Sequence, residues 1–438
     1  FIPNGVSYIK ERVNEILNEN YTSTFANRVK DKIVVRSYED TKKFFDEEES
    51  PELIAVKNGI LNINTKDKIP FTSEKKFFSK IPVTYDEEKD CPSIKKFMGD
   101  ILENKSDINV IQELFGFCLF REYFEEKAFL FNGCGRNGKT KLITLLKLFL
   151  GIENCVEITL QSMESDMYAP SELHKKLSNI AGDMPSKQLE DSSMFKKTTG
   201  RDLISAPRKF KVRLHFVNYS KQIFSCNEIP ITNDFTDAFF LRWIILNFPY
   251  QFLQKKEFDK LHLSNDKIKL QNPNIIEEIV SDDELSGLLN WALEGLKRLR
   301  ENKEFSHSQT TEDTKMQWMR KSSSVEGFLM DECELKWGEY TTKEDFAKHY
   351  SKYCAEHKIK IFSSNQIKEC LENKGVIDDK KYLGGVGAYG SYQQRVWNGI
   401  KMKDTDGKKE ENNKGKEKGG DGKKVEDKTK KTETQQGL

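Results

Sequence analysis

The stretch GCGRNGKT, which runs from Gly133 to Thr140, fits two phosphate-binding patterns at once. Its glycines match G-x-G-x-x-G, which is typical of dinucleotide-binding folds, and its two ends match G-x-x-x-x-G-K-[ST], which is typical of nucleoside triphosphatases. The apolar run KAFLFN comes directly before the stretch, and the apolar-faced segment TKLITLLKLFL follows it. Both patterns belong between a strand and a helix, so this context is compatible with either.

Lys139 and Thr140 favour the triphosphatase pattern. A dinucleotide-binding turn has no role for a lysine at the start of the helix, whereas a triphosphatase needs an ammonium on the β- and γ-phosphates and a hydroxyl on Mg²⁺. Glycines let backbone N–H groups surround a phosphate, and the helix N-terminus adds its positive dipole end. The residues expected to hold the nucleotide are Gly133, Gly135, Asn137, Gly138, Lys139 and Thr140, with Thr140 also a Mg²⁺ ligand.

Three polar residues farther along the chain are candidates to complete such a site. Asp183 ends the apolar run LSNIAGD, where a carboxylate could hold Mg²⁺, and Asn227 ends KQIFSCN, where an amide could bind the γ-phosphate or the attacking water. Arg242 interrupts the apolar stretch DAFFLRWIILNFP, and a charge there needs a partner. Two of them have an ordinary alternative, because an acid such as Asp183 at a strand end is commonly a turn or helix cap and Arg242 could be a surface residue of an edge strand.

The chain of 438 residues is nearly neutral, with 71 Lys and Arg against 70 Asp and Glu, so a nucleic-acid site must be a local patch. The segment APRKFKVRLHF is such a candidate, because basic residues alternate in part with apolar ones. On one face of a hairpin they would form a phosphate-binding ridge; the alternative is an ordinary solvated strand face. The basic residues are Arg208, Lys209, Lys211 and Arg213.

Neither a membrane protein nor a disulfide framework is expected. No apolar run approaches the 18 or so residues that would span a bilayer, and the first residues show no signal-peptide pattern, so we expect a cytoplasmic protein. The eight cysteines are scattered without a C-x-x-C pair, which argues against structural zinc. The chain begins at Phe1, which is consistent with a portion of a longer polypeptide.

The pattern along the chain predicts six segments. Between about 126 and 250, five short apolar runs alternate with helical segments, which is typical of an α/β layer on a largely parallel sheet. Beyond Lys403 the sequence has almost no apolar residues and cannot bury enough surface to fold. The segments are an N-terminal helical segment (1–50), a hairpin-plus-helices unit (51–125), the nucleotide-binding core (126–250), a helical extension and linker (251–314), a helix-and-strand domain (315–402) and a disordered charged tail (403–438).

The motifs taken in order resemble the superfamily-three helicase core of phage and plasmid primase-helicases, a group that includes poxvirus-type enzymes. They are NGCGRNGKT, NIAGDMP, FKKTTGRDLISAPRKFKVRLHF, KQIFSCNEIP and DAFFLRWIILNFP. Upstream, VKNGILNIN and LFGFCLF resemble the unit that precedes this core. Downstream, TKEDFAKHYSKYCAEHKIKIFSSNQIKECLENKG resembles a winged-helix-like segment, a module that binds DNA or protein. The resemblance covers about residues 50 to 400.

The resemblance implies an α/β fold with an AAA+-type P-loop core, a helical N-terminal unit and a winged-helix-like C-terminal domain. It implies a ring, usually a hexamer, that hydrolyses ATP with Mg²⁺ between subunits and pulls a DNA strand through its centre. Lys139 and Thr140 match Walker A, Asp183 the Walker B acid, Asn227 sensor one and Arg242 the arginine finger.

The match departs from the family at the Walker B strand, where the family often has Glu. Here Asp183 stands alone after Gly182, so Glu228 or another acid could share its work. The resemblance also implies that the basic hairpin residues contact DNA in the channel.

The expected function is therefore that of an ATP-dependent DNA helicase or translocase in phage or plasmid replication. It would be the motor part of a primase-helicase, with a possible primase or polymerase domain upstream, acting on single-stranded and forked DNA in the host cytoplasm. Two alternatives stay open. One is an ATP-dependent loader or packaging protein that does not unwind DNA, and the other is a DNA-binding replication initiator with a vestigial nucleotide site.

Overall fold

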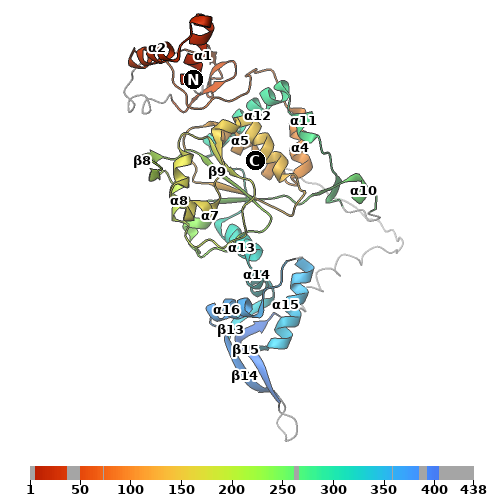
Figure 1. The fold of residues 1–438 in the computed structure, drawn as a ribbon. Coiled ribbons are helices and arrows are strands. Elements are labelled where there is room, and N and C mark those ends of the chain that lie inside the picture. Colours follow the sequence, from red (N-terminus) through yellow and green to blue (C-terminus); the bar gives the residue numbers. More distant parts are fainter. Residues whose placement is uncertain are drawn as a thin grey trace, which may run out of the picture. The chain divides into compact units, whose positions relative to one another are not determined.

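The computed structural model describes residues 5–36, 50–72, 74–260, 266–357, 359–383 and 392–403 (Figure 1). The chain divides into two compact units, Phe1–Ser322 and Ser323–Leu438, and each is described by itself. The tail predicted over 403–438 lies outside the described residues after Lys403. Among the residues described, no helix is both long and apolar enough to cross a membrane.

The first unit is built on a five-stranded sheet whose pairings are all parallel. Its central strands are buried at every position, which is why each reads in the sequence as a short continuous apolar run. The largely parallel sheet predicted between 126 and 250 is therefore confirmed. Across the sheet the order is β10 (Trp243–Asn247), β4 (Ala128–Asn132), β9 (Lys221–Cys226), β6 (Ser178–Ala181) and β5 (Cys155–Val156).

Helices cover both faces of this sheet (Figure 1). Alternate residues of β4 enter two separate cores, with Phe129 and Phe131 in one and Ala128 and Leu130 in the other, as the two-residue period of a strand requires. The first core is closed by α4 (Pro92–Ile101), α5 (Lys105–Leu119), α6 (Lys139–Leu150), α11 (Ile275–Ile279) and α12 (Asp282–Asn302). The second is closed by α7 (Leu160–Ser165), α8 (Ser193–Thr199), α9 (Asp237–Phe240) and α13 (Thr311–Ser322).

Smaller elements surround the sheet. A three-stranded antiparallel sheet precedes it, and its first two strands form a hairpin that turns at Lys57 and Asn58. The extension predicted to be helical from residue 251 also contains a pair of short parallel strands, which is a correction. These elements are α1 (Gly5–Leu17), η1 (Asn18–Asn20), α2 (Ser23–Arg36), β1 (Leu53–Val56), β2 (Gly59–Asn62), β3 (Lys68–Ile69), η2 (Ile152–Asn154), η3 (Ala169–Leu173), β7 (Leu203–Arg208), β8 (Lys211–Val217), β11 (Gln251–Leu253), α10 (Lys255–Phe258) and β12 (Ile268–Leu270).

The second unit combines three helices with a three-stranded antiparallel sheet of order β13-β15-β14. Its separate core gathers Phe328, Phe346, Tyr350, Trp397 and Ile400. The unit begins later than the predicted position 315, because α13 packs Trp318 into the core of the first unit. The winged-helix assignment stays a prediction. Its elements are α14 (Ser324–Glu332), β13 (Cys333–Thr342), α15 (Lys343–His357), α16 (Ser364–Asn373), β14 (Ile377–Leu383) and β15 (Tyr392–Met402).

Lys221, the first residue of β9, is a fully buried lysine. Its Nζ donates to the carbonyl oxygens of Phe120, Glu122 and Tyr219 at 2.6, 2.9 and 2.8 Å. The ring of Phe117 lies 4.4 Å from the same nitrogen. Burial lowers the pKa of Lys221 from 10.5 to about 7, because a charged amine loses its hydration there.

This buried amine should make the stability of the first unit depend on pH. Between pH 7 and 10.5 the folded chain gives up the Lys221 proton, and with it one of the three donated hydrogen bonds, whereas the unfolded chain keeps the proton; the free energy of unfolding should therefore rise with pH in that window. Lys221→Met lacks the titrating group, so its free energy of unfolding should rise less with pH. Urea unfolding of both proteins at pH 7 and pH 9 measures this; parallel pH profiles would contradict it.

Candidate functional site

The phosphate loop joins β4 to α6, and its backbone requires glycine at two positions. Gly138 has φ +91°, in the left-handed region that glycine adopts without strain, and a Cβ there would lie 2.5 Å from Ile101 Cγ2. A Cβ on Gly133 would lie 2.4 Å from Asn137 Nδ2. Gly135 has open space around it, so packing gives no reason for a glycine there. The loop thus curls tightly at both ends and leads directly into the N-terminus of α6.

Lys139 begins α6 and is only 6% exposed. Its Nζ donates to the Gly133 carbonyl and, at 3.1 Å, to Asn227 Oδ1. The contact follows from the sheet order, because β9 pairs beside β4 and Cys226 is in register with Asn132. Burial lowers the pKa of Lys139. The structure therefore brings together two of the predicted site residues around an ammonium that has only neutral hydrogen-bond partners.

Asn137 supplies a second group suited to an anion. Its Nδ2 is buried and has no hydrogen-bond partner in the described part of the chain. A buried donor without an acceptor costs roughly 1–3 kcal/mol, and a phosphate oxygen could satisfy it. Together with the glycine turn and Lys139, this donor fits the loop to a phosphate group.

Asp183 and Thr140 lie near the loop but are both exposed. Asp183 follows β6 and interacts electrostatically with Lys139, although β9 separates its strand from β4. Glu228 is also exposed, directly after Asn227. The described residues contain no cluster of three or more His, Cys, Asp and Glu that could hold a metal. Mg²⁺ in proteins is usually held by one or two carboxylates, and water and substrate phosphates supply its other ligands. One carboxylate from Asp183 and one hydroxyl from Thr140 are therefore enough protein ligands for such an ion.

A cavity of about 500 Å³ opens beside the loop. Arg136, Asn137, Gly138 and Thr140 form one wall. The apolar part of the lining comes from segments far apart in sequence, namely Phe97, Ile101, Phe252, Leu270, Ile275 and Ile279. No local motif marks these residues, so sequence reasoning missed them. The combination of a phosphate loop with an apolar cavity suits a nucleoside attached to phosphates.

Asn247, at the end of β10, connects the start of the phosphate loop to α13. Its Oδ1 accepts hydrogen bonds from Asn132 Nδ2 at 3.1 Å, Gln317 Nε2 at 3.1 Å and Lys321 Nζ at 2.6 Å. Asn132 directly precedes Gly133, so the start of the loop is tied to α13. Burial lowers the pKa of Lys321. Sequence reasoning missed these residues because α13 lies in a polar segment about 180 positions after the loop.

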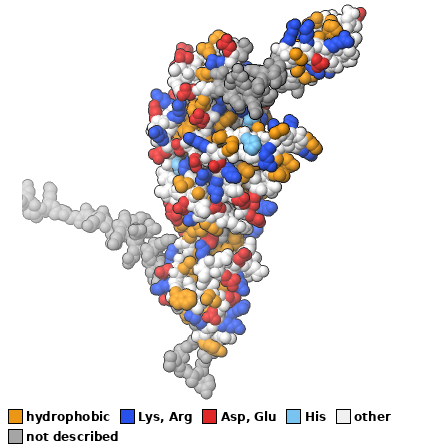
Figure 2. Space-filling model, turned by 90° about the vertical axis from the view of Figure 1, so that its left-hand side faces the viewer, with side chains coloured by type: hydrophobic (Ala, Val, Ile, Leu, Met, Phe, Trp, Pro, Cys, Tyr) orange, Lys and Arg blue, Asp and Glu red, His pale blue; other side chains and the backbone are white. Residues whose placement is uncertain are grey.

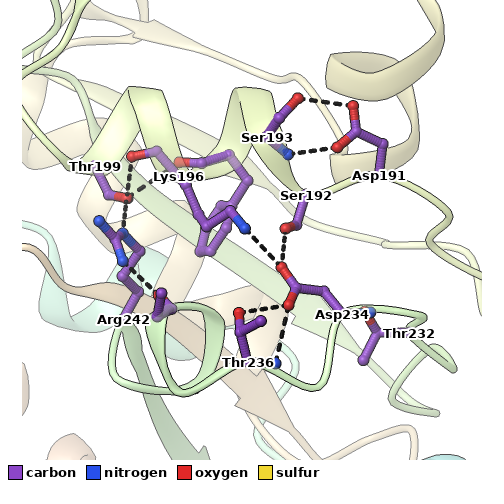
Figure 3. Close-up of polar contacts among 11 residues, drawn as sticks. Asp191, Ser192, Ser193, Lys196, Thr199, Thr232, Asp234, Thr236 and Arg242 are labelled. Carbon is purple, nitrogen blue, oxygen red and sulfur yellow. Dashed lines mark hydrogen bonds and ion pairs between the residues drawn. The ribbon is translucent and has the colours of Figure 1, made fainter.

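Arg242 lies at the opposite edge of the sheet from the loop. It directly precedes β10, and its carbonyl accepts from the backbone N of Ala128, the first residue of β4, at 2.6 Å. The length of β4, roughly 13 Å, therefore separates it from Gly133. Its guanidinium contacts Thr199 (Figure 3) and also Glu126 and Ala238 of its own chain. The structure does not bring Arg242 to Lys139, Asp183 or Asn227 within one chain.

The basic residues of APRKFKVRLHF lie on and around the β7–β8 hairpin. Phe210 at its tip is 96% exposed with φ +59°, and Val212 is 83% exposed. Among the residues described, no carboxylate pairs with Arg208, Lys209, Lys211 or Arg213. Figure 2 shows basic and acidic side chains intermixed over the face it presents, so the hairpin is a local site rather than part of a broad basic surface.

Two basic residues near this hairpin are bonded to other groups of the first unit. Lys196 Nζ pairs with Asp234 Oδ2 at 2.9 Å, and Arg201 Nε donates to the Tyr123 carbonyl at 2.7 Å. Both therefore hold the base of the hairpin to the rest of the unit. Lys197 stays exposed.

Comparisons with known proteins match two protein families and one relative along this chain. Residues 131–242 match the "Family of unknown function (DUF5906)", and residues 7–103 match the family "D5 N terminal like". The chain is 27% identical over 262 residues to "Putative helicase L207/L206" of Acanthamoeba polyphaga mimivirus, an alignment that spans 57% of this chain. It covers only 27% of that relative's length. In sequence, the chain is thus similar to a protein named as a helicase.

The solved structures that match this chain do so at low sequence identity and low TM-score. The apo C-terminal region of NrS-1 matches at 13% identity and a TM-score of 0.35, over 72% of this chain and 77% of that one. The JCV helicase matches at 12% identity and a TM-score of 0.26, over 54% of this chain and 65% of that one. Scores this low do not establish a common fold.

Proposed function

We propose that this chain is an ATP-dependent DNA helicase or translocase, the motor part of a primase-helicase. The observation that carries the proposal is the buried Lys139 ammonium at the N-terminus of α6, held between the Gly133 carbonyl and Asn227. A buried ammonium with neutral hydrogen-bond partners, beside the Asn137 amide that has no acceptor in the described part of the chain, is suited to a triphosphate. The sequence similarity to a protein named as a helicase in mimivirus supports the helicase part of the proposal.

The phosphates of ATP would lie on the loop, with the nucleoside in the neighbouring cavity. Lys139 would turn from the Gly133 carbonyl to the β- and γ-phosphates. Asn227, released from Lys139, would then orient the attacking water or bind the γ-phosphate. Thr140 and Asp183 would hold Mg²⁺, which neutralises charge that develops on the phosphate oxygens.

Arg242 would act on the nucleotide of a neighbouring subunit. Because it lies at the sheet edge opposite to its own loop, it cannot reach its own site without rearrangement of the sheet. This placement supports a ring of the kind that the superfamily-three resemblance implies, usually a hexamer. The β7–β8 hairpin would then contact single-stranded DNA in the channel, within phage or plasmid replication in the host cytoplasm.

Strand displacement on a forked DNA duplex tests the proposal. ATP-dependent displacement is the expected result. DNA-stimulated ATP turnover without displacement would contradict the helicase and favour a loader or packaging protein. Absence of turnover under every DNA condition would favour an initiator with a vestigial site.

The hairpin lysines should contribute to the salt dependence of DNA binding. Replacing both Lys209 and Lys211 with Ala should weaken single-stranded DNA binding and reduce the slope of log K against log [salt] by about 0.7 for each lost phosphate contact. Fluorescence titrations over a range of salt concentrations measure the slope. The pair Lys255→Ala and Lys256→Ala, on exposed α10, changes the net charge equally and should leave the slope unchanged. Equal slopes for both double variants would assign the hairpin lysines to an ordinary solvated surface.

Phe210 should contribute to the same binding through a different interaction. An exposed aromatic ring at the tip of a basic hairpin can stack on a base, which is worth about 1–3 kcal/mol by alanine substitution. Phe210→Ala should therefore weaken single-stranded DNA binding about 5- to 150-fold while the salt slope stays unchanged. Unaltered affinity would remove the ring from the interface.

A further inference from the structure

Thr199 and Arg242 make a contact that fixes the direction of the arginine side chain. Thr199 is fully buried at the end of α8, and its Oγ1 accepts from Arg242 Nε at 3.0 Å (Figure 3). The hydroxyl proton of Thr199 has acceptors within its own helix, the carbonyls of Phe195 and Lys196, both at 3.1 Å. Because the hydroxyl proton points to these carbonyls, the lone pairs of the oxygen face Arg242 and accept its N–H.

The rest of the guanidinium is also held by its own chain. Nη2 pairs with Glu126 at 2.8 Å, and Nη1 donates to the Ala238 carbonyl. A Cβ on Gly200 would lie 3.3 Å from Nη2, so glycine there leaves room for the guanidinium. A guanidinium has five N–H donors, and these three contacts use one donor on each nitrogen. Within the described part of the chain, one donor on each terminal nitrogen has no acceptor, and these two donors form a planar pair suited to phosphate oxygens.

The other end of α8 is fastened at Asp234. Its carboxylate accepts from Ser192 Oγ, from Lys196 Nζ at 2.9 Å and from the backbone N of Thr236 at 3.0 Å (Figure 3). Burial opposes ionisation, but these hydrogen bonds outweigh it and hold the pKa of Asp234 far below its usual value. The segment that connects Asn227 to Arg242 is thus bonded to both ends of one short helix.

We propose that Thr199 is a positioning residue, which aims Arg242 at the nucleotide of the neighbouring subunit from a helix that Asp234 keeps in place. This inference rests on the proposed ATPase function and on the action of Arg242 across the subunit interface. The helix α8 also leads into β7 after residues 200–202. Thr199 and the hairpin are therefore carried by one continuous piece of chain, which Arg242 contacts through its hydrogen bond to Thr199.

The test uses the full chain with Thr199→Val, which removes the hydroxyl and keeps the branched shape. Hydrogen bonds to charged groups are worth about 1.5–3 kcal/mol, so turnover at saturating ATP and single-stranded DNA should fall roughly 10- to 100-fold. Binding of ATP should change little, because the arginine acts on developing charge. Thr199→Ser, which keeps the hydroxyl, should restore turnover.

Thr198→Val is the matched control. Thr198 is equally buried and its hydroxyl also bonds the Phe195 carbonyl, at 2.8 Å, but its hydroxyl makes no hydrogen bond with Arg242. It should retain wild-type turnover. Equal losses in Thr198→Val and Thr199→Val would overturn the inference, because the loss would then report the stability of α8.

Subunit mixing separates a defect in positioning from a general one. Thr199→Val mixed with Lys139→Ala should regain turnover, because one interface can combine an intact Lys139 with a correctly aimed Arg242. Mixed with Arg242→Ala it should regain none, because every arginine in the ring is then absent or misdirected. Recovery with both partners, or with neither while exchange occurs, would overturn the inference. If Thr199→Val does not fold, Asp234→Asn, which loosens the other end of α8, should give the same pattern.

Failure of the proposed function gives a different result. Wild-type chain with no more ATP turnover than Lys139→Ala would overturn the ATPase proposal, and this inference with it. Active wild type, inactive Lys139→Ala and a Thr199→Val protein as active as Thr198→Val would overturn the role of Thr199 alone.

Discussion

Lys139→Ala should reduce ATP turnover to background and leave the fold intact. The variant removes the ammonium that neutralises the β- and γ-phosphates. It loses the buried side-chain stem and the hydrogen bonds of Nζ to Gly133 and Asn227, but it also relieves the burial of a charge whose pKa is already lowered, and the two effects oppose each other. We therefore expect a nearly unchanged melting temperature together with lost turnover. A coupled assay of phosphate release and a thermal melt measure the two quantities.

Lys147→Ala is a suitable control for this variant. Lys147 lies on the same helix, two turns farther along, where its Nζ pairs with exposed Glu157 at 3.0 Å. It should keep wild-type turnover. Substantial turnover by Lys139→Ala would show that the loop is not the triphosphate site, whatever its resemblance to one.

Arg242→Ala should be nearly inactive alone, yet regain turnover when mixed with Lys139→Ala. An arginine supplied to a transferred phosphoryl group is worth about 10³ to 10⁵ in rate. Because Arg242 lies at the sheet edge opposite to its own loop, the two defects fall on different partners of one interface. A mixed ring can then pair an intact Lys139 from one subunit with an intact Arg242 from the next.

The measurement compares ATP turnover of the two variants separately and in equal mixture, with subunit exchange confirmed by native mass spectrometry. Exchange without recovery would indicate that Arg242 acts within its own chain, or that turnover needs consecutive intact sites. Full activity of Arg242→Ala alone would remove the arginine-finger assignment.

The sheet is predictable from the sequence because its strands are buried on both faces. Each such strand reads as a short apolar run, and a polar residue that ends a run must lie at the carboxyl edge. Asp183 and Asn227 are recognised in this way. Strand order is not encoded locally: β9, the fourth strand of the sheet along the chain, lies between β4 and β6. Asn227 therefore contacts Lys139, while Asp183 interacts with it only at longer range.

The rest of the site depends on long-range packing that no local pattern records. Asn247 joins Asn132 to Lys321 across most of the first unit, and the apolar cavity draws on α4, β12 and α11. The same holds for charged side chains. Lys196 and Arg201 read as surface charge beside a basic hairpin, but both are held by partners distant in sequence.

The opposite placement of Arg242 and the phosphate loop has a consequence for how activity scales with protein concentration. If each complete site needs a loop from one chain and an arginine from the next, an isolated chain has none. An open row of subunits has one site fewer than its members, and a closed ring has as many. Turnover per chain should therefore rise steeply as assembly is driven by mass action and level off once rings close. A dilution series of the wild-type chain at saturating ATP would display this dependence without any substitution.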